Sequence, residues 1–336
     1  MNSRERCLAA VRGAPVDRVP VFPLLMSFAA SRHGVTYRQY ASSGHALAEA
    51  QLKVREAFDL DAITACSDAF RISADLGSEM IFPEDTPPFA ARPLVREDAD
   101  LDRLVRPDPV RPGSRMADRV QATREMAHAV GDTCLVLGWV DMPFAEACSV
   151  CGVSQFLLLL HDRPVLAHRL LEFLTEIVIA FSLAQLEAGA LMVGAGDAAA
   201  SLISPRMYRE FALPYEQRVC AAIHARSGLV KLHICGNTGR LLGDMIHSGA
   251  DLFNVDHLVD FSSACETYGA AGKCFKGNLN PVADMLHATP EQCQQLARER
   301  LRTAAGKAYM LSAGCEIPAA VTDEVFRALC QSPKHA

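Results

Sequence analysis

Short apolar runs alternate with longer amphipathic stretches along the whole chain. The runs are rich in Val, Ile, Leu and Phe, which is typical of parallel strands that are buried on both faces and joined by helices. Eight runs fit this description: residues 19–23, 62–68, 134–141, 190–197, 229–235, 252–256, 274–278 and 309–315. Eight such strands predict an α/β fold whose sheet closes into a (β/α)8 TIM barrel.

The stretches between these runs predict the helices of the barrel. They cover residues 45–58, 115–129, 153–188, 205–225, 238–248, 262–268, 290–304 and 323–330. Ser204 before Pro205 and Thr289 before Pro290 are typical of helix starts. Residues 71–114 are rich in Pro, Asp and Arg and show little periodicity, so we expect an insertion or lid there. The expected organisation is a single barrel domain over residues 1–336.

Composition and charge narrow the classes of partner. Half of the 336 residues are hydrophobic, enough for one large core, and the formal net charge is -6. No basic tract is present, so the sequence lacks the electrostatic footprint of a protein that binds nucleic acid or anionic lipid. The expected partner is a small molecule or another protein.

The expected location is the cytoplasm. Residues 1–18 are polar and charged, unlike a secretory signal. The most hydrophobic window, residues 177–196, contains Gln185 and Glu187, so we interpret it as a helix end followed by a buried strand. Twelve cysteines without regular spacing indicate reduced thiols rather than a disulfide framework.

Polar side chains end nearly every predicted strand. In TIM barrels the chemistry lies at the carboxyl ends of the strands. The alternative for each single residue is that it caps the following helix. The residues are Asp68, Asp141, Asp197, His233, Cys235, Asp256, Asn278 and Cys315. Together they predict a polar barrel mouth that is rich in metal ligands.

The stretch Leu-His-Ile-Cys-Gly-Asn-Thr-Gly at residues 232–239 places an imidazole and a thiol two residues apart. On a strand, His233 and Cys235 face the same side. Thiolate and imidazole together favour zinc, and a catalytic zinc site uses three protein ligands and one open position. The alternative is a buried strand without a metal.

A third ligand candidate is Cys315, in Ser-Ala-Gly-Cys-Glu-Ile-Pro at the end of the eighth predicted strand. The fifth and eighth strands are not neighbours, so their loops must curl inward for the ligands to meet. Glu316 could supply a fourth, labile oxygen ligand, but alternation along a strand turns it away from the face of Cys315.

A different class of hypothesis centres on Cys148 and Cys151, which have the spacing of a redox motif. No other thioredoxin-like pattern follows, so we expect buried thiols.

Six segments carry a family resemblance over nearly the whole chain, in the order of the family. The chain resembles the uroporphyrinogen decarboxylase superfamily, and within it the branch of zinc-dependent, corrinoid-linked methyltransferases typified by methylcobalamin:coenzyme M methyltransferase. The segments are RERCLAAVRGAPVDRVPVFP, SDAFRISADLGSEMIFPEDTPP, GDAAASLISPRMYREFALPY, LHICGNTGRLLGDMIHSGADLFNVD, KGNLNPVADMLHATPEQ and SAGCEIP.

This resemblance implies a barrel fold and a zinc ion held by His233, Cys235 and Cys315. The implied enzyme moves a methyl group between a small substrate, such as a thiol, thioether, methoxy compound or amine, and a corrinoid. No Asp-x-His-x-x-Gly segment is present, so the corrinoid is expected on a partner protein. Asp197 and Asp256 are the expected pocket residues that orient zinc ligands or substrate.

Two rival functions stay open at this point. The decarboxylase branch binds an eight-carboxylate tetrapyrrole with arginines after the first strand, where this chain reads Pro-Leu-Leu-Met-Ser-Phe-Ala-Ala-Ser. Without those arginines, bidentate recognition of the carboxylates is missing. The other rival is a non-catalytic module that binds a corrinoid protein and holds a structural zinc. The direction of methyl transfer, the methyl donor and acceptor, the fourth zinc ligand and the oligomeric state also stay open.

Overall fold

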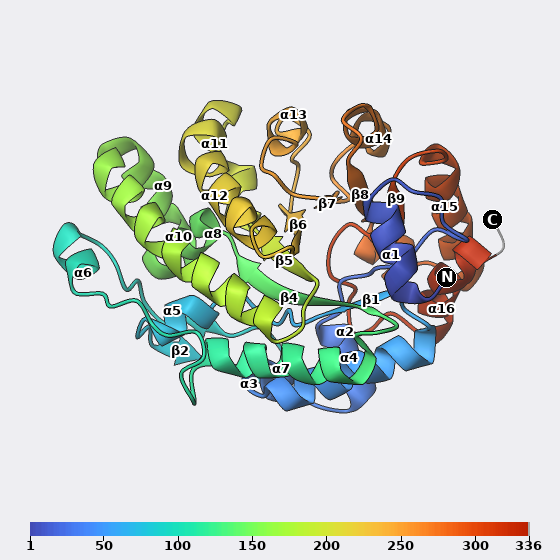
Figure 1. Ribbon diagram of the computed structural model, residues 1–336, viewed down its shortest axis with the longest axis horizontal. Helices are drawn as coiled ribbons and strands as arrows, with labels where there is room; N and C mark the ends of the chain where they lie inside the picture. The colour runs from blue at the N-terminus through green and yellow to red at the C-terminus, as the bar shows by residue number, and fades with distance from the viewer. Residues whose placement is uncertain (335–336) are drawn as a thin grey trace.

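A curled parallel sheet surrounded by helices forms the centre of the protein (Figure 1). The computed structural model describes residues 1–334. Seven strands pair in the order β1-β4-β5-β6-β7-β8-β9, and every neighbouring pair is parallel. Their bounds are β1 (Ala62–Thr64), β4 (Leu135–Asp141), β5 (Met192–Gly196), β6 (Leu229–His233), β7 (Leu252–Asn254), β8 (Cys274–Leu279) and β9 (Tyr309–Ala313). Nearly all strand residues are buried, which confirms the interpretation of the apolar runs.

The first predicted strand, residues 19–23, is not a regular strand, which corrects the count of eight. Val21 makes only an isolated parallel bridge to Leu311 of β9. On its other side, the Asp61 amide donates to the Val21 carbonyl at 3.2 Å, just before β1. Pro20 and Pro23 lack the amide N–H that a ladder needs, which limits the pairing on either side. This segment nevertheless lies between β9 and β1 and gives the sheet its barrel-like closure.

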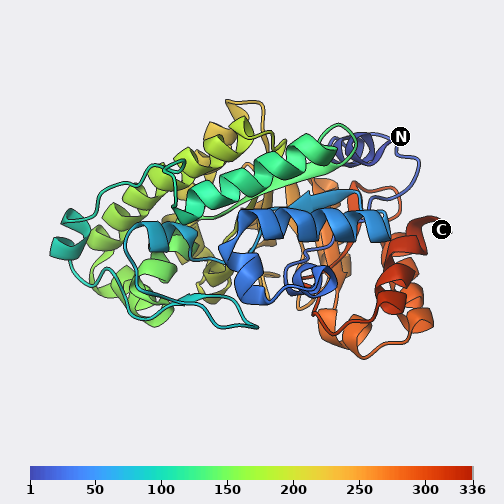
Figure 2. The same ribbon diagram turned by 90° about the horizontal axis from the view of Figure 1, so that it is seen from below.

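Helices cover the outside of the sheet. Figure 2 shows α4 and α7 side by side, and these two helices pack against β1 and β4. The helices before β4 are α1 (Ser3–Val11), α2 (Ser27–His33), α3 (Tyr37–Ser42), α4 (Gly44–Phe58), α5 (Arg71–Asp75), α6 (Asp98–Asp102) and α7 (Arg115–Val130). Those after it are α8 (Pro143–Cys151), α9 (Val153–Asp162), α10 (Pro164–Glu187), α11 (Pro205–Phe211), α12 (Leu213–His224), α13 (Leu242–Met245), α14 (Phe261–Ala270), α15 (Pro290–Thr303) and α16 (Asp323–Gln331).

Prolines divide two of the predicted helices. The helix expected over residues 153–188 is two helices, because Pro164 lacks an amide N–H and starts α10. Pro214 has the same effect on residues 205–225, where α12 begins after α11. The helix expected over 238–248 is reduced to α13. Within residues 1–334, no single helix is long and apolar enough to cross a membrane, and α8 with α9 passes that test only as a pair bent by 108°.

The interval 71–114 has more regular structure than the sequence indicates. It contains α5, an antiparallel pair of β2 (Met80–Ile81) and β3 (Phe89–Ala90), and α6. In Figure 1, α6 lies at the far end of the molecule from the termini. Arg169 of α10 holds α6 through an ion pair with Asp102 at 2.6 Å.

Candidate metal centre

Three of the predicted site residues meet at the carboxyl ends of the strands. Cys235 Sγ lies 2.9 Å from His233 Nε2 and 3.6 Å from Cys315 Sγ, and Cys315 Sγ lies 3.8 Å from His233 Nε2. A tetrahedral zinc with bonds of about 2.1 and 2.3 Å holds such atoms about 3.5 to 3.8 Å apart. Two of the three separations are close to this range, and the third is shorter. Among residues 1–334, no other group of three His, Cys, Asp or Glu side chains is arranged to hold a metal ion.

His233 and Cys235 reach the cluster directly from the end of β6. His233 is the last residue of the strand, and Ile234 between the two ligands is fully buried in the core. Gly236 then turns the chain with a φ of +94°, a conformation that L side chains rarely adopt. The thiol and the imidazole therefore face the barrel mouth while the alternate side chain packs outward.

Cys315 reaches the cluster because the loop after β9 crosses the ends of β8 and β7. The Gly314 amide donates to the Leu279 carbonyl of β8 at 2.8 Å, and the Gly314 carbonyl accepts from Asn254 Nδ2 of β7 at 2.7 Å. A Cβ at Gly314 would lie 2.3 Å from the backbone nitrogen of His257. Only a residue without a side chain fits this close approach, which brings the ligand of β9 towards the ligands of β6.

The two thiols are electrostatically unequal. Hydrogen bonding from Cys235 and then His233 lowers the pKa of Cys315 to about 3. The same contact with Cys315, followed by burial, raises the pKa of Cys235. The contact between the two sulfurs therefore favours one thiolate within the pair. Binding a metal through both sulfurs releases the remaining proton.

The donor set fits zinc. His233 directs Nε2 at the sulfurs, and its Nδ1 is buried with no hydrogen-bond partner among residues 1–334. Cys235 and Cys315 are half-buried, whereas the other ten cysteines are buried. Two sulfurs and one nitrogen are the soft ligands that zinc accepts in catalytic sites.

Asp256 lies beside the cluster and Asp197 lies behind it. Asp256 follows β7, and its carboxylate is close enough to contribute to the raised pKa of Cys235, after the contact with Cys315 and burial. The Asp197 amide donates to the His233 carbonyl at 2.9 Å, but its Oδ1 accepts from the Ala145 amide of α8 at 2.8 Å. The Asp197 side chain thus contacts the surrounding helices rather than the sulfurs. A direct role for either carboxylate stays a proposal.

Asp197 forms a buried acid pair with Glu216 of α12, which the sequence did not indicate. Asp197 Oδ2 and Glu216 Oε1 are buried with no hydrogen-bond partner among residues 1–334, while Glu216 Oε2 accepts from the Tyr208 hydroxyl. Burial and the neighbouring acid raise the pKa of Asp197, and burial raises the pKa of Glu216 to about 7. Two buried carboxyl groups in contact hold a shared proton, because both cannot ionise together.

The shared proton predicts pH-dependent stability. Both folded-state pKa values lie above the unfolded values, so the stabilisation is present at low pH and is lost as the pH rises through about 7. Between about pH 4.5 and 7, where the unfolded chain has lost the Glu216 proton and the folded protein keeps it, the free energy of unfolding should fall by up to about 1.4 kcal/mol per pH unit. Asp197→Asn should reduce this slope, because the amide N–H can donate to the Glu216 carboxylate and does not titrate. Urea unfolding between about pH 5 and 7 measures both slopes, with exposed Asp162→Asn as the control. Equal slopes in all three proteins would contradict a shared proton.

A second network occupies the mouth on the β1 and β4 side. Arg71 Nη2 binds Asp141 Oδ2 at 2.7 Å, and Arg115 binds both oxygens of Asp68 at 2.9 Å. Burial acts against the Asp68 carboxylate, but Arg115 and Arg71 hold its pKa below the usual value. Sequence reasoning identified both aspartates and missed both arginines, since an arginine outside a strand carries no periodic signal. Both guanidiniums are paired with these carboxylates, and Arg71 Nε is the one buried nitrogen of the two that has no partner among residues 1–334.

Two lysines inside the barrel were also missed. Lys231 of β6 and Lys276 of β8 are fully buried around Phe22, and Lys276 Nζ donates to the Phe22 carbonyl at 2.5 Å. Lys231 Nζ lies 4.6 Å from the centre of the Trp139 ring, and burial lowers its pKa to about 8. A lysine within an apolar run was a usable signal, since such a residue is rarely buried without a partner.

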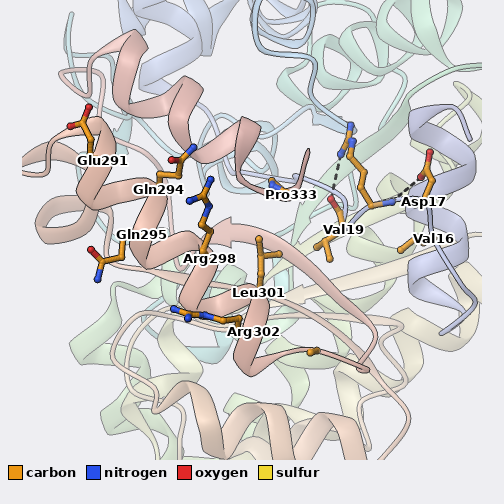
Figure 3. A pocket seen from close by; sticks show the side chains of 12 residues that line it. Val16, Asp17, Val19, Glu291, Gln294, Gln295, Arg298, Leu301, Arg302 and Pro333 are labelled. Atoms are coloured by element: carbon orange, nitrogen blue, oxygen red, sulfur yellow. Dashed lines mark hydrogen bonds between the residues drawn. The ribbon is translucent and has the colours of Figure 1, made fainter. Parts of the chain in front are cut away.

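One large cavity lies away from this centre. It has a volume of about 960 Å³ and lies between α15 and residues 16–19, the segment that precedes the barrel closure. Figure 3 shows Arg298 and Arg302 of α15 on one side and Asp17 and Val19 on the other. None of the predicted site residues lines it, and its walls carry charges of both signs.

Cys148 and Cys151 are placed as expected for structural thiols. Both lie in α8 and are buried. Burial raises the pKa of Cys148 and raises the pKa of Cys151 to about 12. A redox-active cysteine needs the opposite properties, namely exposure and a low pKa.

A curled parallel sheet with polar residues at the carboxyl ends of its strands defines an α/β barrel-like fold. The chain belongs to the uroporphyrinogen decarboxylase family, because the family model "Uroporphyrinogen decarboxylase (URO-D)" matches residues 2–335. A uroporphyrinogen decarboxylase of Nocardia farcinica is 32% identical over 92% of this chain and 88% of its own. One from Xanthomonas campestris is 30% identical, over 87% and 85%.

Solved structures support the fold. A methyltransferase from Methanosarcina mazei matches with a TM-score of 0.90 at 22% identity, covering 99% of this chain and 98% of that one. A B12-independent methionine synthase from Shewanella matches with a TM-score of 0.58 at 12% identity, covering 87% and 85%. These likenesses confirm the predicted barrel-like architecture, and the family match confirms the superfamily resemblance.

Proposed function

We propose that this enzyme is a zinc-dependent methyltransferase that moves a methyl group between a small substrate and a corrinoid on a partner protein. The observation that carries the proposal is the convergence of His233 Nε2, Cys235 Sγ and Cys315 Sγ at the barrel mouth. The substrate is a thiol, thioether, methoxy compound or amine. The printed name of the Methanosarcina mazei structure, a methyltransferase, is consistent with this proposal.

Each residue of the metal centre has its own proposed role. Bound zinc supplies Lewis-acid chemistry, which lowers the pKa of a thiol or makes a methyl donor a better leaving group. Cys235 and Cys315 provide two negative charges that balance the dication, and His233 provides a neutral third ligand. Asp256, beside Cys235, is proposed to orient the substrate or a ligand. Asp197 is proposed to support the end of β6 through its bond to the His233 carbonyl.

Decarboxylation of a tetrapyrrole is the second candidate, because the relatives carry that name. Such a substrate needs guanidiniums for its carboxylates. Arg32, the first arginine after the barrel closure, instead binds Asp323 and the carbonyls of Ala319 and Val321. With Arg71 and Arg115 also occupied by aspartates, these arginines favour methyl transfer over decarboxylation.

The corrinoid partner requires a surface near the mouth. We propose residues 71–114 as a docking or lid element of the single barrel domain. Ile81 and Phe89 of the β2-β3 pair are 44% and 45% exposed, unusual for large apolar side chains. A non-catalytic module with a structural zinc would instead need a closed set of four ligands, whereas three side chains cluster here among residues 1–334.

A cobalt spectrum tests the proposed activity. The zinc-loaded protein is incubated with cob(I)alamin and a panel of methylated thiols, methoxylated aromatics and methylamines, and separately with methylcobalamin and thiols. We expect at least one methyl donor to convert cob(I)alamin into methylcobalamin, or at least one thiol to convert methylcobalamin into cob(I)alamin. Cys315→Ala should abolish the conversion. No cobalt change with any pair, together with carbon dioxide release from a porphyrinogen, would support decarboxylation instead.

A further inference from the structure

The buried amide of Asn254 lies between the two segments that carry the metal ligands. Asn254 ends β7 and is 2% exposed. It is the register partner of His233 on β6, so the two side chains leave the sheet on the same side. Its Nδ2 donates to the Gly314 carbonyl at 2.7 Å, directly before Cys315. One side chain therefore adjoins both ligand-bearing segments.

Two buried polar atoms at this point have no partner among residues 1–334. One is Asn254 Oδ1, an acceptor, and the other is His233 Nδ1. His233 directs Nε2 at the sulfurs, so the imidazole that binds a metal carries its proton on Nδ1 and needs an acceptor there. A buried donor and a buried acceptor on paired residues can satisfy each other, which removes the cost of leaving both unpaired.

We propose that Asn254 is a positioning residue of the metal centre. Its Oδ1 accepts the Nδ1 proton of His233 while its Nδ2 holds the Gly314 carbonyl. This single amide fixes the tautomer of one ligand and the position of the loop that carries another. The inference rests on the proposed metal centre but not on methyl transfer. This role also explains why position 254 holds an amide and not a carboxylate. An Asp there would place a carboxylate oxygen against the Gly314 carbonyl oxygen, and two acceptors cannot form a hydrogen bond.

Asp141 is the rival acceptor for the His233 ring. It lies over Gly196, the register partner of His233 on β5, since a Cβ at Gly196 would be 2.8 Å from Asp141 Oδ1. Asp141 Oδ2 is already bound to Arg71. Asn254 Oδ1 is buried and has no partner among residues 1–334. Leaving Asn254 Oδ1 unpaired therefore costs more free energy than leaving Asp141 without a bond to His233, which favours Asn254 as the acceptor.

Zinc affinity tests this role without measuring activity. We expect Asn254→Leu, which removes both hydrogen bonds, to weaken zinc about 10- to 100-fold in competition with a chromophoric chelator. Asn254→Asp keeps an acceptor for His233 and should recover part of the loss. The Co²⁺-substituted Asn254→Leu protein should also show a shifted ligand-field spectrum. The control is Gln51→Leu, because Gln51 is an equally buried amide whose bonds reach Leu25 and Tyr40 instead.

The outcomes separate the possibilities. Gln51→Leu should lower the thermal midpoint and leave zinc affinity unchanged, which excludes a general effect of losing a buried amide. Wild-type zinc affinity and an unchanged Co²⁺ spectrum in Asn254→Leu would overturn the inference, and a loss seen only in Asp141→Leu, which removes that acceptor, would assign the role to Asp141. If wild-type protein bound no zinc, the metal centre and this inference would fail together. Tight zinc binding that depends on Asn254, without methyl transfer, would refute only the proposed function.

Discussion

Cys315→Ala is expected to lose bound zinc and methyl transfer while the barrel stays folded. The substitution removes one of three protein ligands and leaves His233 and Cys235 as a two-ligand site. The binding free energy of a four-ligand zinc site is about 10 to 16 kcal/mol, so one ligand contributes roughly 3 to 4 kcal/mol. Losing one ligand should therefore weaken zinc binding by about two to three orders of magnitude. Metal content after gel filtration, with the thermal midpoint measured in parallel, gives the result.

Cys148→Ala is the matched control for this variant. Cys148 is a buried thiol of α8 that does not contact the centre, so its removal should leave zinc content and methyl transfer unchanged. Stoichiometric zinc in Cys315→Ala would contradict the ligand assignment. Loss of zinc in Cys148→Ala would show that the α8 thiols contribute to the site after all.

Gly314→Ala is the second variant with a large expected effect. Its Cβ would lie 2.3 Å from the His257 nitrogen, and backbone cannot yield as a flexible side chain would. The loop must then move away from the end of β7, and Cys315 moves with it. We expect zinc affinity to fall about 100-fold, close to the upper range for lost support of a ligand. Chelator competition measures the affinity, and methyl transfer should fall in proportion.

Gly243→Ala provides the comparison for this second variant. Gly243 lies in α13 with no atom within 4 Å of the added Cβ, so zinc affinity should match that of the wild type. An unchanged affinity in Gly314→Ala would show that Cys315 reaches the cluster by a route other than the close approach over β7.

The barrel was predictable because buried parallel strands are continuous apolar runs. Residues 190–197 and 309–315 show this directly, since β5 and β9 lie within them. Residues 19–23 have the same apolar character, yet their prolines prevent a regular ladder. Local composition indicated the segment, whereas its hydrogen bonding depended on the two strands on either side.

The candidate site was predictable as a set of residues but not as a geometry. The spacing of His233 and Cys235 placed two ligands on one face of a strand, the end of the last predicted strand offered Cys315 as a third candidate, and the family resemblance implied that the three act together. Their meeting depends on Gly314 packing over strands that are distant in sequence, which no local pattern contains. Likewise, the position of Asp197 at a strand end was clear, but its contact with Glu216 depends on how α12 packs.

Zinc K-edge X-ray absorption, with and without excess small thiol, tests the central claim most directly. The metal centre described here predicts a resting shell of two sulfurs, one imidazole nitrogen and one light oxygen atom, and a third sulfur when the thiol is added. A resting shell of four protein ligands that the thiol does not change would contradict an open catalytic position.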